Sequence, residues 1–153
     1  MNVTIISVGK RHDPLYAQAI QAYQTRLAAT LRIEWRLLPP SGKDGALARQ
    51  AESSAILAAV KHSDTVWLLD EVGENITSTA LSAKLTTLQF QGISKLVIVI
   101  GGAYGVADSV RSRANWVWSL SNLVFPHQIV RLILIEQLYR AVEINKGSGY
   151  HHA

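Results

Sequence analysis

Cysteine is absent from this chain of 153 residues. Disulfides, thiolate metal sites and cysteine nucleophiles are therefore excluded, and a reducing compartment such as the cytoplasm is the expected location. Long hydrophobic runs are also missing, because 3–8, 66–69 and 96–100 are far shorter than the roughly 20 residues that cross a bilayer. Charged residues follow the first apolar run too closely for a secretory signal, so we expect neither export nor a membrane partner.

Charge is sparse and only mildly biased. Charged residues make up 17% of the chain, the net charge is +4 and the pI is about 9.6. This excess is compatible with a polyanionic partner but does not by itself establish one. With 48% hydrophobic residues and no low-complexity segment, the composition predicts one compact domain over 1–153.

Short β-branched apolar runs alternate with segments of helical periodicity. The expected strands are 3–8, 33–38, 65–69, 95–100 and 116–120. The expected helices are 14–29, 46–61, 78–91, a short one from Asp108, and 128–146. Strands that are nearly all apolar and alternate with helices indicate an α/β fold with a parallel sheet covered on both faces.

Capping residues support two of these helices. Asp13 precedes Pro14, which suits the first turn of a helix, and either Thr77 or Ser78 can cap the helix that follows them. Between the third strand and that helix, the polar residues of 70–75 predict a turn.

Two unusual segments follow expected strands, where open parallel sheets bind ligands. Residues 101–105 have the spacing G-G-x-x-G, which permits close approach of the backbone to a ligand. The spacing matches neither the dinucleotide nor the Walker pattern, and a tight strand-to-helix turn is the alternative. Residues 119–127 mix small polar and apolar side chains, and a plain loop ending at Pro126 is the alternative there.

Together, these segments resemble the SPOUT-class ribosomal RNA large subunit methyltransferase H family. The resemblance lies in Leu69-Asp70 with Gly73, Ile100-Gly101-Gly102 with Gly105, Trp118-Ser119-Leu120-Ser121, Phe125-Pro126-His127, Arg131, Glu136-Gln137-Leu138-Tyr139-Arg140 and Tyr150-His151. It covers the chain in length and element order, and is strong residue by residue from Val66 onward. The family methylates N3 of a pseudouridine in large-subunit (23S) ribosomal RNA, and its Rossmann-like α/β domain carries a C-terminal trefoil knot.

The resemblance implies that S-adenosyl-L-methionine is the methyl donor. By this resemblance the donor would lie against Leu69, Gly101, Gly102, Gly105, Leu120, Ser121, Asn122, Leu123, Val124 and Phe125. Backbone amides and carbonyls can recognise an adenine edge, so few charged side chains are needed in such loops. Direct methyl transfer needs alignment of donor and acceptor, and requires no metal.

Candidate catalytic residues lie near the C-terminus. Pseudouridine N3 is protonated at neutral pH, so a general base would help, and the candidates are Tyr150, His151, His152, Arg140 and Glu136. The alternatives are a frayed tail and an ordinary surface ion pair between Glu136 and Arg140. His152 departs from the Arg or Lys of the family, replacing a fixed charge by a titratable one. His127 could contact the ligand loop, although a structural role is the simpler interpretation.

The expected partners are ribosomal RNA, in the large subunit or the assembled ribosome, and a second copy of the chain. RNA contact would come from the tail and from Lys10, Arg11, Arg111, Arg113 and Arg131. In the homodimer that the resemblance implies, the tail of one subunit completes the donor site of the other. The alternatives are a SPOUT methyltransferase for another RNA site, a catalytically inactive ribosome-binding protein, and a nucleotide-binding or flavodoxin-like protein.

Overall fold

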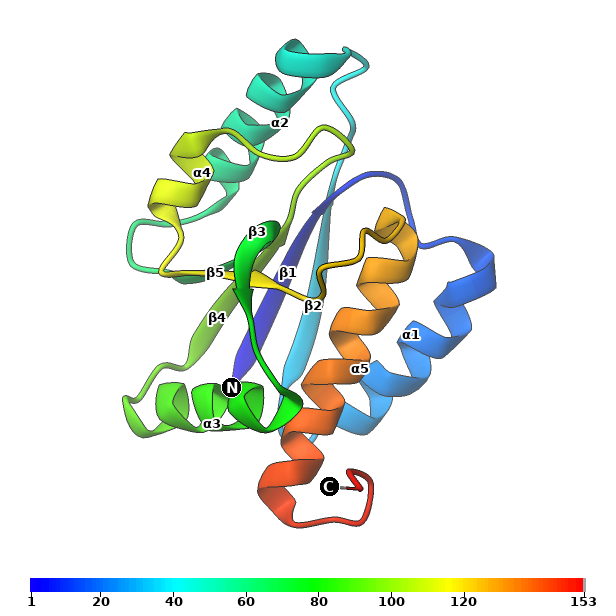
Figure 1. Cartoon of the computed structure of the whole chain (residues 1–153), viewed down its shortest axis with the longest axis vertical. Helices are drawn as coiled ribbons and strands as arrows, with labels where there is room; N and C mark the ends of the chain where they lie inside the picture. The colour runs from blue at the N-terminus through cyan, green and yellow to red at the C-terminus, as the bar shows by residue number, and fades with distance from the viewer. Residues whose placement is uncertain (153) are drawn as a thin grey trace.

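A computed structural model of the chain describes residues 1–152 and contains a five-stranded, all-parallel sheet (Figure 1). The strand order across the sheet is β2-β1-β4-β3-β5. The strands are β1 (Asn2–Val8), β2 (Arg32–Leu38), β3 (Thr65–Asn75), β4 (Lys95–Ile100) and β5 (Trp116–Ser119).

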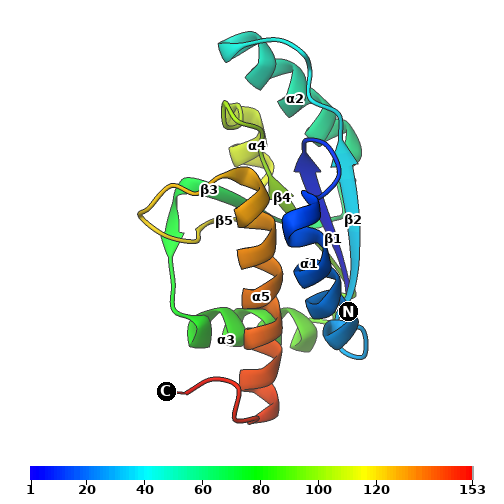
Figure 2. The same cartoon turned by 90° about the vertical axis from the view of Figure 1, so that its right-hand side faces the viewer.

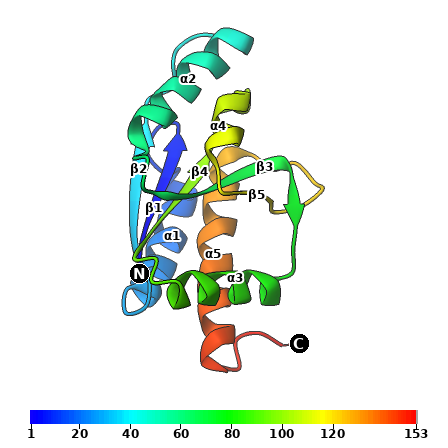
Figure 3. The same cartoon turned by 90° about the vertical axis from the view of Figure 1, so that its left-hand side faces the viewer.

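Helices cover both faces of the sheet (Figures 2 and 3). The helices are α1 (Pro14–Leu27), α2 (Gly45–Ala59), α3 (Ser78–Phe90), α4 (Asp108–Arg113) and α5 (His127–Lys146). One hydrophobic cluster joins the sheet to α1, α3 and α5, and a second joins it to α2 and α4. Within residues 1–152, no helix is long and apolar enough to cross a membrane. The predicted α/β architecture with two covered faces is confirmed.

Alternation along β4 explains how a continuous apolar run serves both faces. Leu96, Ile98 and Ile100 belong to the cluster under α1, α3 and α5. Val97 and Val99 belong to the cluster under α2 and α4. All five side chains are buried, and full burial of such a side chain contributes about 1.5–3 kcal/mol.

The expected helix caps are present. The Asp13 carboxylate accepts a hydrogen bond from the Leu15 N–H at 2.8 Å, at the start of α1. Thr77 caps α3, because its hydroxyl accepts from the Ala80 N–H at 3.1 Å, and Ser78 is the first helical residue. Element boundaries, apart from the end of β3, differ from the predicted ones by one or two residues.

The turn predicted over 70–75 is wrong, since β3 continues to the end of this segment. A register shift between Leu69 and Glu74 accommodates the polar residues, and pairing with β5 resumes where Glu74 lies opposite Trp118. Gly73 packs directly on the Trp118 backbone, where a Cβ would lie 2.6 Å from the carbonyl carbon. Polar residues and a glycine therefore form an irregular strand extension here.

We expect Gly73→Ala to destabilise the protein, because the methyl group would meet backbone atoms that cannot rotate away. Overpacking of this kind costs about 1–3 kcal/mol, or roughly 3–10 °C in Tm for a chain of this size. Thermal denaturation measures the change. Gly149→Ala is the control, since its added Cβ meets nothing within 4 Å; equal melting temperatures for the two variants would contradict the prediction.

Candidate functional site

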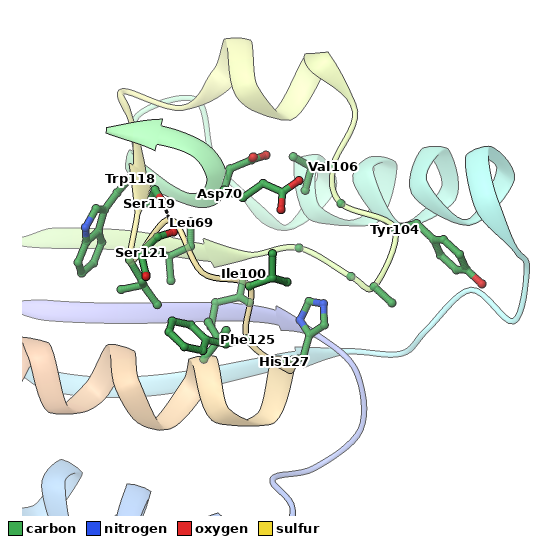
Figure 4. A pocket seen from close by; sticks show the side chains of 18 of the residues that line it. Leu69, Asp70, Ile100, Tyr104, Val106, Trp118, Ser119, Ser121, Phe125 and His127 are labelled. Atoms are coloured by element: carbon green, nitrogen blue, oxygen red, sulfur yellow. Dashed lines mark hydrogen bonds between the residues drawn. The ribbon is translucent and has the colours of Figure 1, made fainter. Parts of the chain in front are cut away.

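A cavity of about 490 Å³ lies at the carboxyl ends of β4 and β5, beside the register shift of β3 (Figure 4). Its walls come from residues 69–71 of β3, the ends of β4 and β5, the loop 101–106, the segment 119–127 and the start of α5. The volume falls within the range of small-molecule and cofactor sites, and the position is the edge where open parallel sheets bind ligands.

Nine of the ten residues expected to contact a methyl donor line this cavity. They are Leu69, Gly101, Gly102, Gly105, Leu120, Ser121, Leu123, Val124 and Phe125. Asn122 is solvent-exposed and is not among the lining residues. Residues from three separate parts of the chain therefore meet at one site.

The loop after β4 needs glycine because of close packing. A Cβ on Gly101 would lie 2.6 Å from the Val106 side chain, and one on Gly102 would overlap the Glu52 carboxylate. Gly105 has a φ of +74°, and its N–H donates to the Gly102 carbonyl at 3.0 Å. The segment is therefore a tight turn, as the simpler interpretation held, and it also presents its backbone to the cavity.

Helix α2 and its N-cap residue fix this loop through two hydrogen bonds. The Ser53 hydroxyl accepts a hydrogen bond from the Ala107 N–H at 2.8 Å, and Tyr104 donates to Asp44 at 3.0 Å. Figure 4 shows the Tyr104 side chain directed away from the cavity centre. The side chains of α2 thus set the position of one cavity wall.

The segment 119–127 forms the opposite wall. The Ser119 hydroxyl donates to the Ser121 carbonyl at 2.9 Å, and the Ser121 hydroxyl accepts from the Leu123 N–H at 3.0 Å. Leu123 and Val124 are 72% and 79% exposed although both are apolar. An apolar cavity rim of this kind is typical of a surface that contacts a ligand or another protein.

His127 is a lining residue that sequence reasoning placed in a structural role. Its ring lies beside the Gly102 backbone, and its Nδ1 atom is buried without a hydrogen-bond partner among the described residues. Burial lowers the pKa of His127 and Arg131 lowers it further, against the raising effects of Gly102 and Glu52. The imidazole is therefore neutral at pH 7.

Other charged side chains at the cavity are partly neutralised. Arg111 forms ion pairs with Asp70 at 2.9 Å and Asp108 at 3.0 Å. Arg49 and Glu71 are exposed at the rim and make no ion pair with any described residue. In the part of the chain that the structure describes, no three His, Asp or Glu side chains gather as a metal site.

The expected RNA contact through Arg131 is wrong, because its side chain is fully buried. The guanidinium donates to the Ser7 hydroxyl at 3.1 Å and to the Lys10 carbonyl at 2.9 Å. It therefore fastens the loop after β1 to α5. The sequence held a signal for this burial, since Arg131 lies on the apolar face of α5 three residues before the buried Leu134.

Two more of the expected RNA cations are occupied within the fold. Arg113 donates from one nitrogen to three backbone carbonyls at 2.7–3.2 Å, and Arg111 is ion-paired. Lys10 and Arg11 are exposed and make no ion pair with a described residue. Among the five candidates outside the tail, these two are the cations left for a polyanion.

Three of the expected catalytic residues form one cluster. Arg140 is ion-paired with Glu136 at 2.6 Å, and the Tyr150 hydroxyl donates to the same carboxylate oxygen at 3.1 Å. The Tyr150 and Tyr23 hydroxyls are 3.3 Å apart. This arrangement is more than a surface ion pair, because the Arg140 and Glu136 side chains are only 26% and 18% exposed.

The cluster disfavours Tyr150 as a base. Burial raises the pKa of Tyr150, and the hydrogen bond with Tyr23 and the charge of Glu136 raise it further. The phenol therefore stays protonated across the physiological range and serves as a hydrogen-bond donor. His151 is partly buried with its Nδ1 atom unpartnered among the described residues, and His152 is exposed.

Within a single chain, the expected donor-site residues and the expected catalytic residues lie apart. None of the expected catalytic residues lines the cavity. His127 and Arg140 lie on the same helix, so the rise of 1.5 Å per residue separates them by about 20 Å. Figure 2 shows the tail after α5 turning back beside the end of that helix that is opposite the cavity segment.

A family model described as "Predicted SPOUT methyltransferase" matches residues 1–151. The chain belongs to the SPOUT methyltransferase family. Its activity class is therefore S-adenosylmethionine-dependent methylation of RNA. The parallel sheet and the cavity at its carboxyl edge agree with this assignment.

We expect stability to fall in mild acid partly because of His127. Its folded pKa lies below the ordinary value of 6.5, so the unfolded chain takes up a proton first as the pH falls. The contribution of His127 to the free energy of unfolding is therefore complete above pH 6.5, and it is lost as the pH falls toward the folded pKa. His12 acts in the same direction, mainly through burial.

Urea denaturation between pH 7.5 and 5 tests this expectation. The free energy of unfolding should depend less on pH in His127→Gln than in the unchanged chain. His62→Gln, at an exposed position, is the control. An unaltered pH dependence in the His127 variant would show that this ring titrates alike in both states.

Tyr150→Phe should loosen the tail. The change removes the hydrogen bonds with Glu136 and Tyr23, each worth about 1 kcal/mol net, and keeps the aromatic ring. Hydrogen exchange over 147–152 should therefore accelerate several-fold. Tyr104→Phe, which loses an exposed hydrogen bond far from the tail, should leave that exchange unchanged.

Proposed function

We propose that the chain transfers a methyl group from S-adenosylmethionine to N3 of a pseudouridine in 23S ribosomal RNA, in the cytoplasm. The observation that carries the proposal is the convergence of nine expected donor-site residues on one cavity. These residues come from three stretches of sequence that were singled out for their resemblance to one rRNA methyltransferase family. The match to the SPOUT family supports the reaction class.

The cavity fits an adenosine-bearing donor. Apolar side chains of Leu69, Ile100 and Phe125 line it, and glycine backbone at 101 and 102 offers amide and carbonyl groups beside them. A flat heterocycle can lie against the apolar surfaces while the backbone recognises its polar edge. When bound, the donor supplies an electrophilic methyl group on a positively charged sulfur.

The contribution of the protein is positioning. Alignment of the attacking nitrogen with the methyl group can lower the barrier by roughly 7–11 kcal/mol. The N3 proton must also leave, and a group that accepts it or stabilises the resulting anion accelerates the reaction. His127 is neutral and lines the cavity, which places one imidazole within the chain at the proposed reaction site.

We further propose a homodimer in which one copy's tail completes the other copy's donor site. The supporting observation is the separation of about 20 Å along α5 between the cavity and Arg140. In this arrangement Tyr150, His151 and His152 reach the cavity of the partner, while Glu136 and Arg140 anchor the tail. The proposal includes the C-terminal trefoil knot of the family, formed around the segments 101–106 and 119–127.

The direct test is transfer of labelled methyl from S-adenosylmethionine to ribosomes that lack the modification. Digestion to nucleosides should place the label in 3-methylpseudouridine. Gly101→Ala should reduce labelling at least tenfold, because its Cβ would meet Val106. Donor binding without rRNA labelling would point to another RNA or a binding-only protein, and absence of donor binding would contradict the proposal.

Mixing two inactive variants tests the composite site. A chain lacking 150–153 and a Gly101→Ala chain should each have little activity alone. When both are unfolded and refolded together, about half of the dimers are mixed, and each mixed dimer has one intact cavity with one intact tail. Activity should therefore return to roughly a quarter of the unmodified level. No recovery in verified mixed dimers would contradict completion between chains.

A further inference from the structure

Helix α2 carries a buried carboxylate that the proposed reaction does not use. Glu52 is 7% exposed. Its Oε1 atom accepts a hydrogen bond from the Ser41 N–H at 3.2 Å, whereas Oε2 is buried without a partner among the described residues. No cation of residues 1–152 forms an ion pair with it. A buried polar atom left unpaired is costly, so its presence calls for an explanation.

The unpartnered oxygen lies directly behind the cavity wall. A Cβ on Gly102 would overlap Oε2 and would lie 3.1 Å from the carboxyl carbon of Glu52. Gly102 itself lines the cavity. The Glu52 carboxylate therefore packs against the backbone of a glycine that lines the cavity.

The charged groups near Glu52 do not neutralise its carboxylate. His127, which also lines the cavity, is kept neutral by burial, which lowers its pKa. Arg131 is buried as well, but its hydrogen bonds are directed to the β1 side, at Ser7 and Lys10. Arg49 is exposed at the rim, where water screens it. Of the other acidic groups at the cavity, Asp70 is paired with Arg111 and Glu71 is exposed, so Glu52 is the carboxylate that is both buried and without an ion pair among the described residues.

We infer that Glu52 determines ligand preference at the donor site, favouring the cationic methyl donor over its neutral product. The inference rests on the proposed use of S-adenosylmethionine. The donor carries a positive charge on its sulfur, and loss of the methyl group leaves a neutral thioether, S-adenosylhomocysteine. The two molecules differ at the sulfur, in the methyl group and in the charge, so a carboxylate charge behind the cavity wall discriminates between them.

Coulomb's law sets the expected size. At an effective dielectric constant of about 20, two unit charges attract enough to change a binding constant roughly tenfold even when they are about 12 Å apart, as in any pair of that separation. Such a preference would promote exchange of product for donor after each turnover. It also gives a function to a carboxylate whose burial is costly to the fold.

The test compares binding of S-adenosylmethionine and S-adenosylhomocysteine by titration calorimetry on the full chain. Glu52→Gln keeps the shape and removes the charge, so the ratio of the two dissociation constants should shift about tenfold toward the product. Glu52→Met, a second neutral variant of similar volume, should give the same shift, and Glu52→Asp should retain the original preference. Glu34→Gln removes a charge from an exposed position on β2 and is the matched control.

The outcomes are distinct. A ratio in the two neutral variants equal to that of the unmodified chain would overturn the inference, as would a parallel loss of both ligands, which would mark Glu52 as a packing residue. If neither ligand binds the unmodified chain, the proposed function fails and the inference fails with it. Thermal denaturation supplies an independent check, because both neutral variants should be at least as stable as the unmodified chain.

Discussion

Close backbone packing after β4 is the constraint on which the cavity depends. Gly101 lies against Val106 and Gly102 against Glu52, so neither position has room for a side chain. This contact brings the loop onto α2 and leaves its backbone at the cavity that residues 69–71 of β3 and the end of β5 also line. Any larger residue would push the loop outward and change the wall against which the proposed donor lies.

Helix α5 links this wall to the rest of the molecule. Its first turn places His127 at the cavity, and Arg131 holds the loop after β1 through buried hydrogen bonds. The middle and second half of the same helix carry Glu136 and Arg140, and Tyr150 of the following tail hydrogen-bonds to Glu136. The helix thus spaces two groups of candidate residues apart, and this spacing is the reason for proposing a site shared between two chains.

Local chemistry made most of the fold predictable. The alternation of apolar runs and helical periodicity identified every strand and helix, and Asp13 and Thr77 occupy their expected caps. The extension of β3 beyond Leu69 was missed, because polar residues with a glycine indicate a turn unless the partner strand is known. Pairing partners of this kind are set by tertiary structure, which a single sequence does not reveal.

The candidate site was predictable to a smaller extent. Resemblance located nine cavity-lining residues, whereas the burial of Arg131 and the unpaired Glu52 carboxylate depend on contacts between distant segments. Periodicity on α5 gave a signal for Arg131, but nothing in the sequence near Glu52 indicates that it lies behind Gly102.

We propose this cavity as the place where the methyl donor binds. A crystal structure of the full chain with S-adenosylhomocysteine tests it most directly. The account predicts ligand density between the glycine loop at 101–105 and the segment 119–127. Density at any other place on the protein, with this cavity empty, would contradict it.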